Sequence, residues 1–427
     1  MSTGTRDLAK VAFIAVFGTT IEYYDFILAG LAAALIWPTV YYPQVPPSLA
    51  LFFSIVTFAL GIAVRPIGAF MFGHFGDRLG RKFVMIWTLI IMGVGTLGII
   101  LTPGYTSIGI LGGILIAIFR IVQGIGIGGQ WGGAAVWVIE HAKNSKRRAF
   151  WTNFVNLGVP LGLLLSSGVF LAIISSLTRD DLLNWGWRLA FVIGVLVIII
   201  GIIVRYKFAE SPIFKQIIDK GETYKLPAVV ALKEQWKRII LLAVVFNYMI
   251  SLFYIATAFN LGYMIRIGVD IKTAFLSEII GAIVIIFAQV IGSLIGDSIG
   301  RKKVILIGSI LSILVAYPYM ILINTREATN IILAQSMFLG SEMFGYGVIG
   351  AFLPENFPTK YRNSGSSLSY QLAAPLSSIA SFLAPYFLVA YGASAWIYIS
   401  GMIVGICLAS LLALLFTKET IKVDISK

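Results

Sequence analysis

A seven-residue motif, GDRLGRK at residues 76–82, recurs as GDSIGRK at residues 296–302, with five of the seven positions identical. A second repeated pattern follows each motif: a glutamate stands seven residues before an arginine. Because both patterns return in the same order, the sequence indicates two related halves. The echoing pairs are Glu140 with Arg147 and Glu355 with Arg362.

The composition indicates that the solvent of this chain is lipid. Of its 427 residues, 59% are hydrophobic and 12% are charged, whereas a soluble domain carries about 25% charged residues. A membrane-spanning helix needs about 20 apolar residues. We therefore expect an all-α integral membrane protein with twelve transmembrane helices in two pseudo-symmetric six-helix bundles. The expected spans are residues 11–36, 48–75, 83–101, 108–140, 149–175, 187–207, 238–262, 273–296, 303–323, 328–354, 364–389 and 392–416.

The longest polar stretch, residues 208–237, separates the first six expected spans from the last six. We interpret it as a cytoplasmic linker between an N-terminal bundle at residues 1–207 and a C-terminal bundle at residues 238–427. Placing both termini on one side puts most of the 32 lysines and arginines on that side. Since positively charged loops remain in the cytoplasm, the sequence predicts a multi-pass cell membrane protein with both termini cytoplasmic. The net charge of +13 therefore reflects topology, and we expect no nucleic-acid partner.

Charged side chains within the expected spans are the leading functional candidates, because a charge at the bilayer centre costs about 2.5 to 3.5 kcal/mol. In the first span, Glu22 and Asp25 stand three residues apart, on one face of a helix. Arg65 and Arg120 fall near the middle of the second and fourth spans. Glu22 is the proton carrier itself, a partner of Arg65, or a helix cap in a water-filled cavity.

The central charges of the two halves differ. Those of the first half balance, whereas the second half contributes Glu342 without a central lysine or arginine. A dicarboxylate or tricarboxylate would lack a second basic partner, so this count favours a monocarboxylate or a zwitterion as the substrate. In the alternative interpretation, Glu342 is a buried structural acid.

The seventh span carries a polar stripe. Asn247, Ser251 and Tyr254 follow one another at helical spacing, which indicates the lining of a cavity. The alternative is hydrogen bonding between helices, which contributes about 0.6 kcal/mol per bond in membranes. The expected substrate-binding residues are Arg65, Gln123, Gln130, Trp131, Asn247, Ser251, Tyr254, Glu342, Tyr346, Tyr370 and Gln371.

The loop GHFGDRLGRK at residues 73–82 resembles the signature loop between helices 2 and 3 of the major facilitator superfamily. Other segments resemble its metabolite:proton symporter branch, although members commonly have an acid where this chain has Gln130. The resemblance implies uptake of a small polar metabolite, such as an organic acid or a zwitterionic osmolyte, driven by the proton gradient. The segments are GTTIEYYDFILAG (18–30), RPIGAFMFGHFGDRLGRK (65–82), RIVQGIGIGGQWGGA (120–134), WGWRLAF (185–191), ESPIF (210–214) and FPTKYRNSG (357–365).

The resemblance also implies residue roles. In related proton-coupled sugar carriers, an arginine of helix 4 pairs with an aspartate of helix 1, and Arg120 and Asp25 have these positions here. We therefore expect Asp25, Glu22 and Arg120 to couple protons, because a nearby arginine favours the charged carboxylate and its withdrawal favours the protonated form. The alternative is a permanent structural ion pair.

At the cytoplasmic mouth, the resemblance implies charge clusters that close the carrier when it faces outward. The alternative is that the basic residues serve only to set the topology. The expected gate residues are Asp77, Arg78, Arg81, Glu140, Arg147, Asp297, Arg301, Glu355 and Arg362.

These features predict a proton-coupled symporter that imports a monocarboxylate or zwitterionic solute by alternating access. The alternatives are a proton-coupled sugar or polyol carrier and a drug or metabolite exporter. We expect no enzyme activity, no metal and no cofactor besides the coupling proton, since the sequence has no GxxxxGK[ST] loop and no histidine or cysteine metal motif. The expected partners are the small-molecule substrate, protons and the lipid bilayer, with a monomer as the functional unit.

Overall fold

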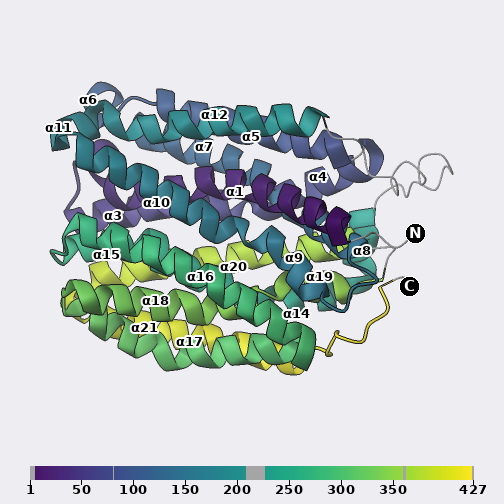
Figure 1. Ribbon diagram of the computed structural model, residues 1–427. Helices are drawn as coiled ribbons and strands as arrows, with labels where there is room; N and C mark the ends of the chain where they lie inside the picture. Colours follow the sequence, from purple (N-terminus) through teal and green to yellow (C-terminus); the bar gives the residue numbers. More distant parts are fainter. Residues whose placement is uncertain (1–4, 80, 208–226, 359–361, 426–427) are drawn as a thin grey trace.

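The structure, a computed structural model, describes residues 5–79, 81–207, 227–358 and 362–425. Helices form nearly all of these residues, and no strand occurs among them. The long helices run side by side, and the start of the first helix and the last described residues lie at the same end of the bundle (Figure 1). We call this end the terminal end and the opposite one the distal end.

The first half contains six spans, of which several are broken into two helices near the middle. The breaks fall at Val64, at Gly129 and Gln130, and at Leu157. The spans are α1 (Thr5–Leu35), α3 (Pro47–Ala63) with α4 (Arg65–Leu79), α5 (Arg81–Leu101), α7 (Leu111–Gly128) with α8 (Trp131–His141), α9 (Arg148–Asn156) with α10 (Gly158–Ser176), and α12 (Trp187–Lys207). Short helices connect them: α2 (Trp37–Tyr41), α6 (Tyr105–Ile108), α11 (Arg179–Asp181) and η1 (Leu182–Gly186).

The second half begins with a long helix at Pro227, so residues 227–237, which the sequence analysis assigned to the linker, are helical. The rest of the expected linker, residues 208–226, lies outside the described residues. The spans are α14 (Pro227–Tyr254) with the π-helix η2 (Ile255–Phe259) and α15 (Asn260–Arg266), α16 (Ile271–Ile299), α17 (Arg301–Asn324), α18 (Ala328–Tyr346) with α19 (Ile349–Glu355), α20 (Arg362–Tyr391), and α21 (Ala395–Leu415), which follows the short η4 (Gly392–Ser394).

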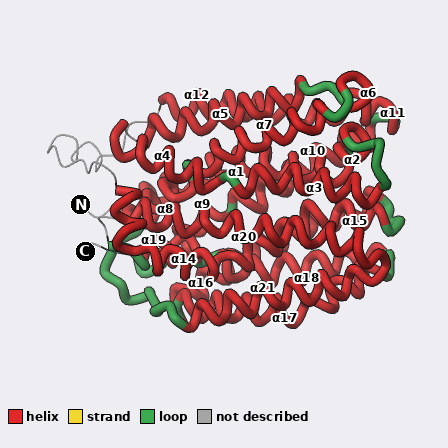
Figure 2. Tube along the Cα trace, turned by 180° about the vertical axis from the view of Figure 1, so that it is seen from behind, coloured by secondary structure: helices red, strands yellow, loops and turns green. Residues whose placement is uncertain are grey.

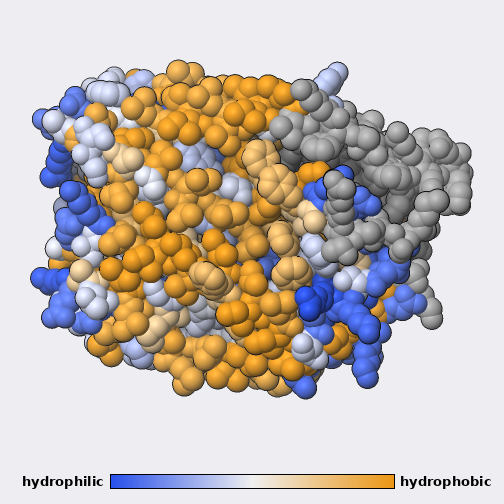
Figure 3. Space-filling view, viewed as in Figure 1, coloured by the Kyte–Doolittle hydropathy of each residue, from blue (hydrophilic) through white to orange (hydrophobic). Residues whose placement is uncertain are grey.

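Ten stretches of the described residues are long and apolar enough to cross a membrane. One of them, residues 362–415, consists of α20 and α21, and a shorter apolar helix at residues 86–101 lies within α5. These elements give the twelve spans that the sequence predicted, so the all-α membrane fold is confirmed. Apolar side chains cover the middle of the molecule, and hydrophilic ones gather at both ends (Figure 3).

The two halves lie against each other along the length of the bundle, with the first half mainly in the upper part of Figure 1 and the second half in the lower part. The view from behind shows the same division (Figure 2). Between them, α20 packs on α3, α4 and α8, α16 packs on α9 and α10, and η2 and α15 pack on α1.

Glycines allow the helices of the first half to approach one another closely. A Cβ atom at Gly128 would collide with the carbonyl oxygen of Arg65, and one at Gly124 would collide with that of Gly61. Only glycine permits this separation. As a result, α7 lies against the break between α3 and α4, and Arg65 and Arg120 both reach the ring of Phe26, at 4.1 and 4.6 Å.

Candidate functional site

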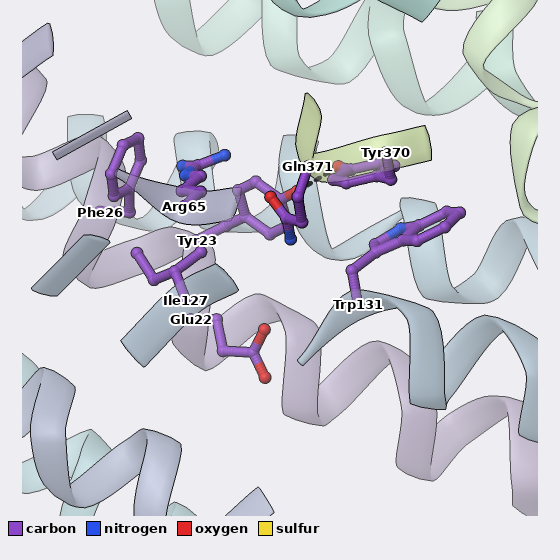
Figure 4. A pocket seen from close by; sticks show the side chains of 8 residues that line it. All are labelled: Glu22, Tyr23, Phe26, Arg65, Ile127, Trp131, Tyr370 and Gln371. Atoms are coloured by element: carbon purple, nitrogen blue, oxygen red, sulfur yellow. Dashed lines mark hydrogen bonds between the residues drawn. The ribbon is translucent and has the colours of Figure 1, made fainter. Parts of the chain in front are cut away.

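A small cavity lies between the two halves. Its walls come from α1, α4, α7 and α8 of the first half and from α20 of the second half. Figure 4 shows Arg65 beside Phe26 and Trp131 beside Tyr370. Because both halves contribute walls, a movement of one half against the other must change the shape of the cavity. The lining residues are Glu22, Tyr23, Phe26, Arg65, Ile127, Trp131, Tyr370 and Gln371.

Arg65, the first residue of α4, is 1% exposed and carries unsatisfied hydrogen-bond donors. Its guanidinium lies 4.1 Å from the centre of the Phe26 ring and 5.8 Å from that of Tyr254. Nε and Nη2 have no hydrogen-bond partner, and Arg65 forms no salt bridge among the described residues. A buried cation with free donors is costly unless another group completes its hydrogen bonds. The cavity is therefore complementary to an anionic group.

Glu22 lines the same cavity and is almost fully buried. Gln130, at the break between α7 and α8, faces it. In the amide orientation that suits both neighbours, the Gln130 nitrogen donates to Glu22 Oε2 at 2.8 Å and the Gln130 oxygen accepts from the Thr88 hydroxyl at 2.6 Å. Gln130 is thus a neutral neighbour of Glu22.

Three tyrosines connect the halves through their hydroxyl groups. Tyr23 of α1 and Tyr346 of α18 each lie 2.7 Å from the hydroxyl of Tyr370 on α20. Trp131 stacks on Tyr370, with 3.9 Å between the ring centres, and Phe246 stacks on Tyr370 at 4.5 Å. These rings form an aromatic wall that spans the interface, a surface suited to apolar or cationic groups.

Asp25 is fully buried among α1, α5 and α7, away from the residues that line the cavity. Its Oδ2 accepts from the hydroxyl of Thr96 at 2.8 Å and from the amide of Gln123 at 2.9 Å, while Oδ1 has no partner. Arg120 Nη1 in turn donates to Gln123 Oε1 at 2.5 Å. The expected direct ion pair of Asp25 and Arg120 is therefore absent. Gln123 connects them because its amide offers a donor and an acceptor at once.

The expected stripe on the seventh span divides in two. Tyr254 packs on Phe26 and Phe58 of the first half, with ring centres 5.8 and 5.6 Å apart. Ser251 donates to Asn247 at 3.0 Å, and neither residue lines the cavity. The stripe therefore reaches the interface only at its distal end.

Glu342 also lies outside the cavity lining, contrary to the expectation that it is a central charge. It is fully buried within the second half, close enough to Tyr248 and Cys407 to interact with them electrostatically. Neither carboxyl oxygen has a hydrogen-bond partner. The sequence located its depth in the span correctly but did not show which face of α18 it occupies. The cavity charges therefore reduce to Arg65 and Glu22.

Ion pairs join the halves at the terminal end. Glu355 Oε1 lies 3.1 Å from Arg148 Nε, and Arg362 Nη1 lies 3.8 Å from Glu140 Oε1. Each half thus gives one acid and one arginine to the other. The echo in the sequence pointed to Arg147, but its exposed side chain forms no ion pair among the described residues. Arg148 takes that place because it is the first residue of α9 and faces α19.

The repeated motif of the second half contributes to the same contact. Asp297 accepts from the backbone amides of Ala149 and Phe150, at 2.9 and 3.0 Å, and so caps α9 of the first half. Arg301 contacts Asp297 at 3.2 Å and Glu355 at 3.1 Å. The side chains of the matching residues in the first motif, Asp77, Arg78 and Arg81, lie outside the described residues.

The chain after α21 crosses this cluster, which the sequence analysis did not predict. Arg148 donates to the carbonyl oxygens of Ile421 and Val423 at 3.0 and 2.9 Å. The Thr420 hydroxyl donates to Glu355 at 2.7 Å, and the backbone amide of Arg301 donates to Glu419 at 2.9 Å. The C-terminal segment therefore adds to the contact between the halves.

Several uncharged members of the site and its surroundings were not expected from the sequence. Tyr23 stands between Glu22 and Asp25 in the first span, and Thr96 is one of two threonines in the mostly apolar third span. Both positions carried a signal that a search for polar side chains on the same helix face would have found. Phe26 and Ile127 carried none, because apolar residues abound in every span.

Comparison with known proteins agrees with this architecture. Residues 11–381 match the family described as Major Facilitator Superfamily. The chain is 35% identical to the inner membrane metabolite transport protein YhjE of Escherichia coli K12, over 96% of this chain and 94% of that protein. It is 31% identical to the shikimate transporter of that strain, over 94% and 93% of the two chains. It is 30% identical to the proline/betaine transporter of the strain, over 89% and 77%.

Among solved structures, the chain resembles the xylose transporter XylE from Escherichia coli in a partially occluded inward open conformation. The TM-score is 0.76, and the match covers 97% of this chain and 98% of that one at 17% sequence identity. At this identity the likeness supports the fold alone.

Proposed function

Because the chain belongs to the major facilitator superfamily, we propose that this transporter is a proton-coupled symporter that imports a small monocarboxylate or zwitterionic solute by alternating access. The observation that carries the proposal is the buried Arg65 guanidinium, which has free donors at a cavity walled by both halves. A carboxylate would accept from these donors, and charge-assisted hydrogen bonds of this kind are about twice as strong as neutral ones.

The rest of the cavity suits the other end of such a solute. Gln371 Oε1 is a buried acceptor without a partner, and Glu22 supplies a carboxylate. The stacked rings of Trp131 and Tyr370 offer a face to an apolar or cationic group. Since the positive charge of Arg65 and the negative charge of Glu22 balance, a zwitterion fits both charges, and a monocarboxylate fits when Glu22 is protonated.

The names of the relatives support this class of substrate. Shikimate, proline and betaine, the solutes named for two of them, each carry one carboxylate. A sugar, the cargo named for the structural neighbour XylE, offers only hydroxyl groups, and these would form weaker hydrogen bonds with the free donors of Arg65 than a carboxylate would. We therefore place a sugar or polyol second.

For the coupling proton we propose Asp25. It is held by Thr96 and Gln123 but has one free oxygen, and Gln123 ties it to Arg120. A movement of α7 that withdraws Gln123 would remove a donor and the influence of the arginine together, which favours the protonated form. Binding and release of a proton would then follow the conformational change. A membrane potential of 100 mV supplies about 2.3 kcal/mol per proton, and one pH unit adds about 1.4 kcal/mol.

We place the terminal end in the cytoplasm, as the distribution of positive loops indicates. The ion pairs of Glu355 with Arg148 and of Arg362 with Glu140 would then form the inner gate. Because every one of these contacts crosses between the halves, opening toward the cytoplasm must break them together.

The proposal is tested by uptake into proteoliposomes under an imposed proton gradient. Radiolabelled shikimate, proline and glycine betaine serve as probes, with xylose as the comparison. We expect accumulation of at least one carboxylate probe, which a protonophore abolishes and Arg65→Gln removes. Accumulation of xylose alone, or uptake that does not depend on the proton gradient, would contradict the proposal.

A further inference from the structure

A further buried carboxyl group, Glu278, lies on α16 in the second half, outside both the cavity and the Asp25 cluster. Its side chain is fully buried. Oε1 accepts from Gln335 Nε2 at 3.3 Å, whereas Oε2 has no hydrogen-bond partner. Because α16 begins at Ile271 at the distal end, a rise of 1.5 Å per residue places Glu278 about 10 Å along the span.

The orientation of the Gln335 amide is fixed by its other partners. Nε2 also donates to the carbonyl oxygen of Ala256 at 2.9 Å, and that oxygen can only accept. Oε1 accepts from the Tyr319 hydroxyl at 3.0 Å and from Asn260 at 3.4 Å. The amide therefore presents an N–H group to Glu278, and the carboxyl receives a single neutral hydrogen bond.

No basic group compensates a charge on Glu278. The residue forms no salt bridge among the described residues, and α10, which packs on α16, has no titratable side chain. An isolated ionised carboxylate in such a place is far more costly than the neutral acid. The titratable groups on the other neighbouring elements are Arg301, Lys302, Lys303, Tyr317 and Tyr319 on α17, Glu342 and Tyr346 on α18, Tyr263 and Arg266 on α15, and Arg148 on α9. The bases of α17 and α9 lie at the terminal end, whereas Glu278 lies near the distal end.

Gln335 connects this carboxyl to the break in the seventh span. Ala256 belongs to the π-helix η2, and Asn260 is the first residue of α15. The same segment closes the distal end against the first half. A Cβ atom at Gly30 of α1 would lie 3.3 Å from the Cβ of Ala258, and one at Gly262 would contact Leu51. A change at Glu278 thus reaches the contact between the halves through two hydrogen bonds of a single amide.

We propose that Glu278 is a proton-binding site of the second half, and that its bound proton holds η2 and α15 against α1 at the distal end. With the proton on Oε2, the carboxyl is neutral and the Gln335 network is undisturbed. When the proton leaves to water, the charged carboxylate draws donors and solvent toward itself, and the network releases the segment. This site does not depend on the assignment of Asp25.

Pulsed electron paramagnetic resonance tests the proposal. Nitroxide labels are attached at Gln44→Cys, on the distal loop of the first half, and at Arg266→Cys, at the end of α15, in a Cys407→Ala background. Both labelled positions are exposed. In nanodiscs without substrate, we expect the population with a longer label distance to grow as the pH rises, by up to about tenfold per pH unit for a single proton.

The matched variants decide the interpretation. Glu278→Gln mimics the protonated acid and is expected to keep the short distance at every pH. Glu342→Gln, a change at another buried acid of this half, is expected to retain the pH-dependent shift. Should Glu278→Gln fail to fold, Gln335→Leu leaves the acid in place and is expected to show the long distance throughout. A Glu278→Gln profile equal to that of the parent, or a distance that follows sodium concentration at fixed pH, overturns the proposal.

Discussion

Two buried arginines approach the same phenylalanine ring and yet differ in their partners. Arg120 donates to Gln123 and to the carbonyl oxygen of Phe58, at 2.5 and 3.3 Å, and through Gln123 it reaches Asp25. Arg65 has two free nitrogen atoms and faces the cavity. Arg120 belongs to a hydrogen-bond network inside one bundle. Arg65 instead has two nitrogen atoms that no group of the protein satisfies.

This difference separates the two tasks of a coupled carrier. A guanidinium with partners from its own bundle can tune a neighbouring carboxyl, and a guanidinium with free donors at a cavity can bind a ligand. The expected consequence is that variants at the two places fail in different ways. Variants of the Asp25 network should uncouple transport, and variants of Arg65 should abolish binding.

The largest expected effect is that of Asp25→Asn on accumulation. Without a titrating carboxyl, the gradient no longer drives uptake, and the accumulation ratio should fall from as much as several hundredfold, for about 3.7 kcal/mol of driving force, to about one. Counterflow between equal pools of substrate should persist and should lose its dependence on pH. Both quantities are measured in the same proteoliposomes, and retained accumulation by the variant would contradict the coupling role.

The next largest effect is expected for Arg65→Gln. Loss of a buried charged partner costs about 2 to 5 kcal/mol of binding, so substrate affinity should fall by about thirtyfold or more. The thermal stability of the empty protein should stay the same or rise, because the variant removes an unsatisfied buried charge. Scanning fluorimetry combined with a binding titration checks both statements. A fall in stability without a fall in affinity would indicate a structural arginine.

A smaller effect is expected for Gln123→Leu, which keeps the size of the side chain and removes the link between Arg120 and Asp25. Both charged groups then lose a hydrogen bond inside the bundle, and the free energy of unfolding should fall by about 1 to 3 kcal/mol. The affinity for substrate should change little, since Gln123 does not line the cavity. Denaturation in detergent and a binding titration, with Gln371→Leu as the matched cavity variant, distinguish the two regions.

The smallest effect is expected for Thr420→Val, outside both regions. It removes the hydroxyl that donates to Glu355 and leaves the ion pair with Arg148 in place. The inner gate should open slightly more easily, by about 1 kcal/mol or about fivefold. The rate at which a reporter cysteine in the terminal end of the cavity is alkylated measures this change. A larger effect than that of Glu355→Gln would show that the C-terminal segment, rather than the ion pairs, holds the gate.

The twelve spans could be predicted from the sequence because apolar length is a local property. Arg65, Trp131, Tyr370 and Gln371 were expected at the substrate site and line the cavity. Glu22, which was expected to couple protons, lines it as well. Glu342 was misplaced because its depth in a span does not show which bundle face it occupies.

The remaining differences arise from packing between helices. Gln123 intervenes between Asp25 and Arg120 because its amide lies within hydrogen-bond distance of both side chains. The close packing of α7 on α3, α4 and α5, which its glycines permit, helps to fix this position. Arg148 replaces Arg147 at the gate because the start of α9 determines which arginine faces Glu355. Neither fact can be obtained from the spacing of residues along one chain.

The central claim is that Arg65 binds the carboxylate of the substrate, and a paired titration tests it most directly. Each carboxylate probe is compared with a partner that lacks only the carboxylate: glycine betaine with choline, and proline with prolinamide. Binding to the purified transporter is followed by thermal shift, in the parent and in Arg65→Gln. The account predicts that the parent is stabilised by at least one carboxylate and by neither partner, and that Arg65→Gln loses the response. Equal stabilisation by a carboxylate and its partner, or an unchanged response in Arg65→Gln, would contradict it.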